Sequence, residues 1–399
     1  MDLDLKDKWI EIDVGKVLHN LNEVRNHLPA GVKLIAVIKA DAYGHGAVKT
    51  AQLLTAKGVD FFAVTFLDEA LEIRKAGIDA QIMIFSPLTE DEQYIKAIQN
   101  NITLTIASLK ECHDLDLISR NLGKRVTIHL KVDTGLGRFG LNAQDAAQIC
   151  QTLKENNYIY IEGVYTHMAD AAMSEKYTAR QFSAFLAVIE DLYKQGFEFP
   201  LKHCANSSVF LRCPNMYLDA VRIGTLLSGQ NPAGNFNKKL NLQDPFKYKS
   251  RIIALRQLEK GSYLGYFRTY RLKQTAKVAV LPVGFADGLA LGVQNPPTGF
   301  IDMIKLLIKQ LLSYLGFRKY SLQVRIKGAL YPIRGKVFMQ NCLVEIPANV
   351  EVSVGEEVEL PIRKTLAAKD TRYEYINETA SFTEVQTYSL DKKASWEDC

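Results

Sequence analysis

Short apolar runs alternate with longer polar segments between residue 33 and about residue 230. Eight of these runs have the length and composition of β-strands, namely 33–39, 60–66, 80–86, 102–107, 125–132, 159–166, 199–204 and 218–224. The segments between them, such as "DEALEIRKAG" at 68–77, repeat apolar residues at the spacing of an amphipathic helix. Such alternation predicts an α/β fold, a (β/α)8 TIM barrel, in preference to an open doubly wound sheet.

The pattern changes at "GQNPAGNFNKKLNLQDP", residues 229–245, a stretch rich in Asn, Gly and Pro that is typical of a loop. Strand-like runs then follow one another without helices between them. We therefore expect two domains, a barrel in residues 1–240 and a mostly β domain in residues 241–399. One segment breaks the second pattern, because 301–317 repeats its apolar residues at helical spacing while Lys305 and Lys309 fall on another face.

Charge adds a local feature to this helical segment. The whole chain has a formal net charge of +5. The stretch from Asp302 to Lys327 holds six basic residues and one acid, an excess as large as that of the whole chain. Because the remainder is close to neutral, a general nucleic-acid surface is not expected. We expect the helix to pack on its own domain with solvated lysines, in preference to a membrane or partner contact.

Three further features indicate the compartment. No apolar run reaches the length of about 18 residues that a membrane span requires, and the charged N-terminus does not resemble a signal peptide. The six cysteines are scattered, without the spacing of metal ligands. We expect a reduced, cytoplasmic protein without a bound metal.

Polar and charged residues recur where the predicted barrel strands end, which is the face where barrel enzymes gather their catalytic groups. They are Lys39 and Tyr43 after the first strand, Lys131 and Arg138 at the fifth, His167 after the sixth, Asn206 and Ser207 after the seventh, and Arg222, Gly224 and Thr225 at the eighth. A lysine can form a Schiff base, and the small residues after the last two strands suit a phosphate. Together these groups suggest pyridoxal phosphate.

Each of these residues also has a plainer explanation. Lys39 alone is better read as a strand-end lysine whose amine reaches solvent, His167 alone as a core or surface histidine, and the glycines after Lys131 as loop residues. Lys131 itself fits less easily, because an unpaired buried ammonium group costs several kcal/mol. The joint occurrence of these groups at five strand ends favours the cofactor.

The residues resemble a known family, the bacterial alanine racemases. "AVIKADAYGHGA" is similar to the cofactor-lysine motif of that family, and its later motifs are matched in order by "KVDTGLGRFG", "THMADA", "HCANSS", "RIGTLLSG", "LGYFRTY", "LPVGFADG" and "GKVFMQ". The resemblance implies a pyridoxal phosphate enzyme with an N-terminal barrel and a C-terminal β domain. It also implies a head-to-tail homodimer whose active sites are completed across the interface, with residues 1–12 pairing with the C-terminal domain.

The resemblance implies a role for each candidate. Lys39 would hold the cofactor and act as one acid/base group, and Tyr266 of the partner subunit would be the other. The cofactor phosphate would be bound by Tyr43, Ser207, Gly224, Thr225 and Tyr373, near Asn206; Arg222 would face the pyridine nitrogen and His167 the ring. Arg138 and the backbone of Met339 would bind the carboxylate of the amino-acid substrate. Lys131 matches the position of a lysine that is often carbamylated in the family.

The chain departs from the family pattern in several places. Phe285 stands where the family has a tyrosine, Gln340 follows Met339 in place of an aspartate, the C-terminal tail differs, and residues 292–325 resemble an insertion. The implied activity is interconversion of L- and D-alanine, with D-alanine supplied to peptidoglycan. The alternatives are a serine or broad-spectrum amino-acid racemase, a decarboxylase of the same fold, which Arg222 argues against, and a non-catalytic protein that binds the cofactor.

Overall fold

The computed structural model describes residues 7–233, 240–293, 296–297, 299–314 and 321–377. The chain divides into two compact units. One comprises Gly15–Asp244, and the other combines Met1–Val14 with Pro245–Cys399. We refer to them as the barrel unit and the β unit.

The barrel unit is built on one sheet of parallel strands. These are β2 (Lys33–Val37), β3 (Phe61–Val64), β4 (Gln81–Ile84), β5 (Ile102–Ile106), β6 (Val126–Lys131), β7 (Ile159–Tyr165), β8 (Leu201–His203) and β9 (Ala220–Ile223). They are ordered β8-β7-β6-β5-β4-β3-β2-β9. A parallel bridge between Ala205 and Val221 brings β9 beside β8, so the sheet curls round into a barrel. The (β/α)8 prediction is confirmed.

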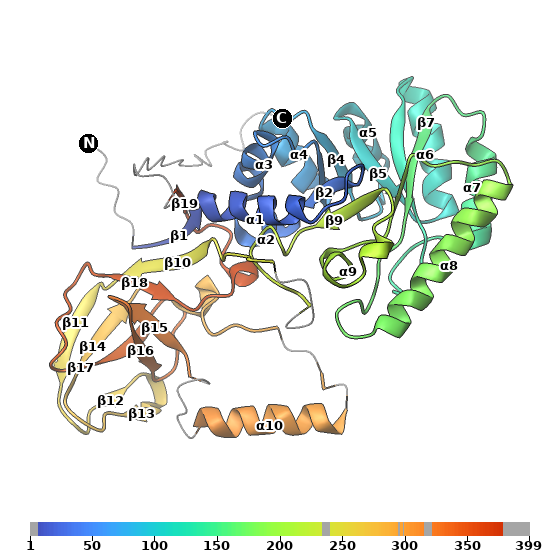
Figure 1. Ribbon diagram of the computed structural model, residues 1–399. Helices are drawn as coiled ribbons and strands as arrows, with labels where there is room; N and C mark the ends of the chain where they lie inside the picture. The colour runs from blue at the N-terminus through green and yellow to red at the C-terminus, as the bar shows by residue number, and fades with distance from the viewer. Residues whose placement is uncertain (1–6, 234–239, 294–295, 298, 315–320, 378–399) are drawn as a thin grey trace. The chain divides into compact units, whose positions relative to one another are not determined.

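Helical segments alternate with these strands, and the longer ones cover the outside of the sheet (Figure 1). They are α1 (Val14–Asn26), α2 (Lys39–Gly44), α3 (Ala47–Thr55), α4 (Leu67–Lys75), α5 (Asp91–Gln99), α6 (Leu109–Leu122), α7 (Ala143–Leu153), α8 (Glu175–Lys194) and α9 (Ser207–Arg212). Local sequence sets several starts, since the side chains of Ser108, Asn142 and Ser174 each accept a hydrogen bond from the backbone N–H three residues on. Buried residues such as Leu21 and Leu115 then hold each apolar face on the core.

A directed chain of hydrogen bonds crosses the barrel interior. Arg222 Nη1 lies 2.7 Å from His203 Nδ1, His203 Nε2 lies 2.8 Å from His129 Nδ1, and His129 Nε2 lies 2.9 Å from Glu162 Oε2. Arginine can only donate, so His203 accepts at Nδ1 and carries its proton on Nε2. The same reasoning places the proton of His129 on Nε2, where it is donated to Glu162. Both imidazoles are therefore neutral links between a cation and an anion.

Gly163 makes room for this chain where β7 passes between β6 and β8. A Cβ atom at this position would lie 2.7 Å from His129 Nδ1 and 2.6 Å from the backbone oxygen of Leu201. Both separations are shorter than a carbon atom tolerates, so only glycine fits without displacing the histidine or the neighbouring strand.

The β unit contains a nine-stranded sheet ordered β11-β14-β17-β16-β15-β18-β10-β1-β19. Its strands are β1 (Lys8–Asp13), β10 (Phe246–Arg251), β11 (Ala254–Leu258), β14 (Ala276–Leu281), β15 (Gln323–Ile326), β16 (Ala329–Arg334), β17 (Cys342–Pro347), β18 (Glu357–Leu360) and β19 (Tyr373–Ile376). Between β11 and β14 in the sequence, β12 (Tyr263–Leu264) and β13 (Tyr270–Arg271) form a short antiparallel hairpin. Strand β1 pairs antiparallel with β10 and parallel with β19.

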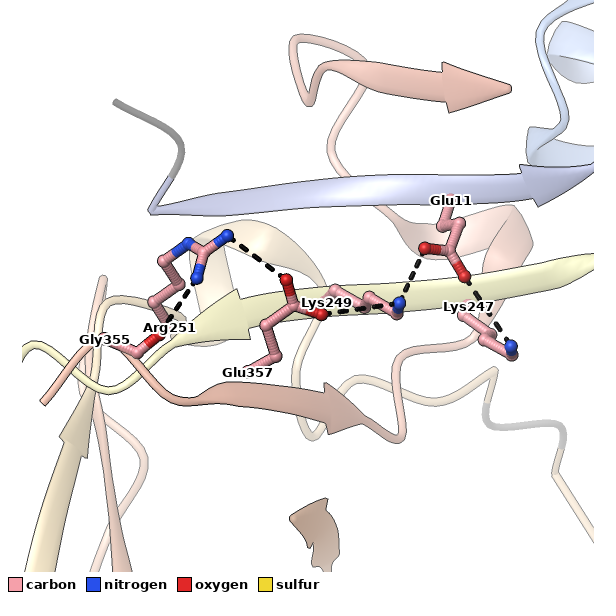
Figure 2. A network of polar contacts seen from close by, with 6 residues as sticks. All are labelled: Glu11, Lys247, Lys249, Arg251, Gly355 and Glu357. Atoms are coloured by element: carbon pink, nitrogen blue, oxygen red, sulfur yellow. Dashed lines mark hydrogen bonds and ion pairs between the residues drawn. The ribbon is translucent and has the colours of Figure 1, made fainter. Parts of the chain in front are cut away.

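Ion pairs bind the N-terminal strand to its neighbour. Glu11 on β1 is buried and accepts Lys249 Nζ at 2.6 Å, with Lys247 Nζ at 3.6 Å (Figure 2). Lys249 Nζ also lies 3.6 Å from the carboxylate of Glu357 on β18. The same carboxylate forms an ion pair with Arg251 Nη2 at 3.1 Å. A network of alternating charges is worth more than isolated surface pairs, so these contacts strengthen the pairing of β1 with β10 and of β10 with β18.

The amphipathic helix of the β unit is α10 (Phe300–Tyr314). Every described side chain from 300 to 311 is exposed. The expectation that this helix packs on its own domain is therefore wrong for the described residues. Residues 315–317 of the expected helix lie outside the described part of the chain. Among the described helices, none combines the length and apolarity needed to cross a membrane.

The buried histidines make the stability of the barrel unit dependent on pH. Burial and the charge of Arg222 lower the pKa of His203 and, with Arg138, lower that of His167 to about 3. Burial also lowers the pKa of His129. The unfolded chain binds protons at these residues below about pH 6.5 and the folded chain does not, so the stabilisation is complete above that pH and is lost as the pH falls. Below about pH 6.5, each histidine should lower the free energy of unfolding by up to about 1.4 kcal/mol per pH unit.

The change in the free energy of unfolding with pH is measured by urea unfolding at pH values between 8 and 5, about one unit apart. The circular dichroism signal of the helices monitors the unfolding. His129→Gln should reduce the slope by the share of one histidine, whereas the exposed His113→Gln serves as the control. A free energy of unfolding that does not change between these pH limits would contradict the neutral assignment.

Candidate functional site

A cavity of about 220 Å³ opens at the carboxyl ends of the barrel strands. The barrel residues that the sequence singled out line it together: Lys39, Tyr43, Arg138, His167, Asn206, Ser207, Arg222, Gly224 and Thr225. Lys131 is not among the residues that line the cavity and is buried at the end of β6. The structure thus brings into one site the groups that the sequence placed at five separate strand ends.

Lys39 enters the cavity through an unusual turn. The four residues after it, Ala40 to Tyr43, all have positive φ between 51° and 58° although none is glycine. Left-handed backbone costs an L-residue roughly 1–2 kcal/mol at each position. Side chains hold the turn against this cost, since Glu69 accepts from the N–H of Ala40 at 2.6 Å and Asp41 accepts from the N–H of Ala47 at 2.6 Å.

The turn places Lys39 and Tyr43 on the same cavity. Burial, together with the charge of Arg138, lowers the pKa of the Lys39 amine. A larger fraction of this amine is therefore neutral near physiological pH than for an exposed lysine, and only the neutral amine attacks a carbonyl group.

Arg222 forms the floor of the site and is 3% exposed. Besides His203 Nδ1, its guanidinium donates to the backbone oxygens of Thr166 at 2.8 Å, His203 at 3.2 Å and Cys204 at 3.3 Å. His167 Nδ1 lies 3.4 Å from Nη2. Among the described residues no carboxylate contacts this guanidinium, so a buried cation is held by neutral groups alone.

Tyr43, Ser207, Gly224 and Thr225 line another part of the cavity. Tyr43 packs against Gly224, where a Cβ atom would collide with the tyrosine ring and hydroxyl. The N–H of Gly224 donates to Ser207 Oγ at 3.3 Å. Thr225 Oγ1 is buried and has no hydrogen-bond partner among the described residues. A buried hydroxyl without a partner is unfavourable, so this atom marks a place for a ligand acceptor.

Asn206 lines the cavity but has a structural task as well. Its Oδ1 accepts from the N–H groups of Ser208 and Val209 at 3.1 and 3.0 Å, which caps α9. Its Nδ2 donates to the backbone oxygen of Met168 at 3.3 Å. The side chain therefore fixes Ser207 and the loop after β8.

Lys131 finds partners inside its own loop. Its Nζ donates to the backbone oxygen of Phe139 and lies 4.2 Å from the centre of the Phe139 ring. Burial and the charge of neighbouring Arg138 lower its pKa to about 8. Asp133 accepts from the N–H groups of the glycine-rich turn that follows, which shapes the loop that presents Arg138 to the cavity.

A second group of predicted residues lies on the β unit. Tyr266 is 68% exposed, and its ring makes an edge contact with Phe338 at 5.1 Å between centres. The backbone oxygens of Phe338 and Met339 accept from the N–H groups of Phe285 and Ala286 at 3.0 Å. Tyr266, Phe285 and Met339 are thus neighbours on one exposed surface.

Tyr373 is separate from that group in its contacts. It lies at the start of β19, opposite Ile10 of β1, and its ring stacks on Tyr375. Tyr373, Tyr266 and Met339 belong to the β unit, whereas the residues that line the described cavity belong to the barrel unit.

Sequence reasoning missed Tyr165, which also lines the cavity. Its ring stacks on His203 at 4.9 Å, lies 5.2 Å from the Arg222 guanidinium and carries a hydroxyl 3.0 Å from Thr105 Oγ1. Side chains alternate between the two faces of a strand, so Tyr165 lies on the same face of β7 as Gly163. This alternation was the signal in the sequence that could have placed Tyr165 inside the barrel.

Comparisons with known proteins agree with this architecture. The family models "Alanine racemase, N-terminal domain" and "Alanine racemase, C-terminal domain" match residues 12–232 and 246–389. An alanine racemase of Desulforamulus reducens is 35% identical over 366 residues, covering 89% of this chain and 92% of that protein. One from Methanococcus maripaludis is 33% identical over 353 residues, covering 88% and 87%. The solved alanine racemase of Clostridium difficile 630 is 29% identical, with a TM-score of 0.82 over 93% of this chain and 96% of that one. The chain therefore belongs to the alanine racemase family.

Proposed function

We propose that this protein racemises alanine with pyridoxal phosphate bound in the barrel cavity. The observation that carries the proposal is the meeting of Lys39, the carboxylate-free Arg222 and the unpartnered hydroxyl of Thr225 in one cavity. We further infer a homodimer in a reducing compartment, where the D-alanine formed would supply peptidoglycan. The family resemblance supports these last points.

The residues present fit the cofactor. A phosphate would give Thr225 Oγ1 the acceptor that it lacks, beside Ser207, Tyr43 and the backbone of Gly224. Its negative charge would offset the field of Lys39, Lys131, Arg138 and Arg222, which acts together with burial to lower the pKa of His167 to about 3. When bound, pyridoxal phosphate supplies an electron-withdrawing ring that acidifies the Cα–H of an attached amino acid.

Arg222 would hold the ring nitrogen by donating to it. Because a guanidinium has no acceptor and does not lose its proton, it keeps that nitrogen unprotonated. A carboxylate at the position of Arg222 would instead favour a protonated ring nitrogen. Arg222 would thereby favour return of a proton to Cα, which supports racemisation over decarboxylation.

Inversion at Cα needs two proton-transfer groups, one on each face. Lys39 is the only lysine that lines the described cavity, and its lowered pKa suits the first role. Tyr266 of the partner subunit would be the second group. The exposure of Tyr266 beside Met339 supports this assignment, since both would be available to another surface.

Arg138 would bind the substrate carboxylate with the backbone of Met339, and Lys131 would position Arg138. We propose that Lys131 is carbamylated. Its lowered pKa favours the neutral amine that reacts with carbon dioxide, and the product would be an anion beside Arg138 in place of a second cation.

The proposal is tested first on the purified protein with added pyridoxal phosphate. We expect a visible absorbance band from lysine-bound cofactor and racemisation of L-alanine faster than that of L-serine. Lys39→Ala should lose both the band and the activity. A preference for serine would assign the alternative racemase, and a band without turnover of either amino acid would contradict the enzyme assignment.

Tyr266→Phe tests the second acid/base group. Because the two enantiomers have equal free energy, kcat/KM must fall equally in both directions, by about a hundredfold or more. Exchange of the Cα hydrogen of one enantiomer with deuterated water should survive, since it needs only Lys39. Tyr263→Phe, an exposed tyrosine on β12, is the matched control. Loss of exchange from both enantiomers would contradict the assignment of one group to each face.

Carbamylation of Lys131 predicts a response to carbon dioxide. Activity should fall when the protein is stored free of carbon dioxide at acidic pH and should recover with bicarbonate. Lys131→Gln should be less active and unresponsive to both treatments. Carbon-13 NMR of the intact protein in ¹³C-bicarbonate checks the modification directly. Fully active protein that lacks a carbamate signal, or a carbamate signal that persists in Lys131→Gln, would refute it.

A further inference from the structure

Helix α10 presents apolar side chains to solvent along its length. Phe300 and Ile301 are 71% and 70% exposed, and Leu307, Ile308 and Leu311 are 61%, 51% and 57% exposed. No described side chain of the β unit covers them. A contiguous apolar surface of this kind marks an interaction site in a protein that is otherwise ordinary in composition.

The surface is sharply divided around the helix. At 100° per residue, the exposed apolar side chains of α10 fall within about 220° of the circumference; they are Phe300, Ile301, Met303, Ile304, Leu306, Leu307, Ile308 and Leu311. Lys305, Lys309 and Asp302 fall on the opposite side. Within the described residues neither lysine forms an ion pair, so both charges are free to meet an anionic surface.

The length of α10 decides how such a helix can be used. Its 15 residues span roughly 22 Å, less than the ~30 Å of a bilayer core. A helix of this length is also marginal alone in water, so it needs an apolar surface against its apolar side. These properties describe a helix that lies in the plane of an interface.

We propose that α10 docks the protein on an anionic lipid bilayer, lying flat with its apolar side among the acyl chains. The broad apolar side and the narrow lysine-bearing side match an interfacial helix. Lys305 and Lys309 supply the charge complementarity, because they would lie at the level of acidic lipid headgroups.

A second copy of α10 fits the same surface less well. Helix pairing in water uses a narrow apolar seam repeated over at least three or four heptads. The apolar side of α10 is about 220° wide, which is broader than such a seam, and its 15 residues make only about two heptads. Self-association is therefore kept as an outcome of the test.

Vesicle flotation of the full-length protein tests the proposal. Vesicles of phosphatidylcholine are compared with vesicles that also contain about 30% phosphatidylglycerol. We expect the protein to float with the anionic vesicles, with a partition coefficient about tenfold higher than with phosphatidylcholine alone. Ile304→Glu with Ile308→Glu should lower binding to the anionic vesicles at least tenfold. Lys305→Gln with Lys309→Gln should remove the preference for anionic lipid while leaving the apolar side intact.

The control carries the same charge change away from α10, as Leu117→Glu with Val354→Glu, both at exposed positions. It should float like the unaltered protein, and racemase activity and circular dichroism show that each variant is folded. Failure of the unaltered protein to float with either vesicle, or equal flotation of the Ile304/Ile308 variant, overturns the proposal. A third outcome is that the unaltered protein does not float but associates with itself as its concentration rises, and that the Ile304/Ile308 variant does not associate. This outcome overturns the lipid proposal in favour of a second copy. None of these outcomes depends on catalysis, so they are separable from the proposed racemase function.

Discussion

The direction of one hydrogen-bond chain governs the interior of the barrel. Arg222 can only donate, and this property fixes the protonated nitrogen of His203 and then of His129, until the chain ends on the carboxylate of Glu162. Charges of opposite sign are thereby joined through neutral groups across the core. Protonation of either imidazole would place a donor against a donor, so the core tolerates only one arrangement.

The same chain keeps Glu162 two imidazoles away from Arg222, so among the described residues no carboxylate contacts this cation at the floor of the cavity. A buried guanidinium held only by carbonyl oxygens and imidazoles is costly, and Lys39, Lys131 and Arg138 add to its field. The fold accepts a further cost in the left-handed turn after Lys39. The negative charge of the proposed phosphate ligand would offset the positive charge that is gathered at this cavity.

Much of this site could be predicted from the sequence, for a definite reason. In a barrel all strands end on one face. The predicted topology alone therefore groups residues that are far apart along the chain, such as Lys39 and Arg222. The turn after Lys39 could not be foreseen, since "ADAY" contains no glycine to signal positive φ. His129 and Glu162 were hidden too, because a polar residue that points into a barrel looks like any alternating strand residue.

The packing of α10 was predicted wrongly because amphipathicity shows that a helix buries one side without showing against what. The division of the catalytic residues raises a related point. Two-sided proton transfer needs groups on opposite faces of a planar centre, and the barrel cavity offers Lys39 on its own elements. Tyr266 and Met339 belong to the other unit and are exposed there. With Tyr266 as the proposed second proton-transfer group, activity would depend on assembly, because neither unit alone holds both groups.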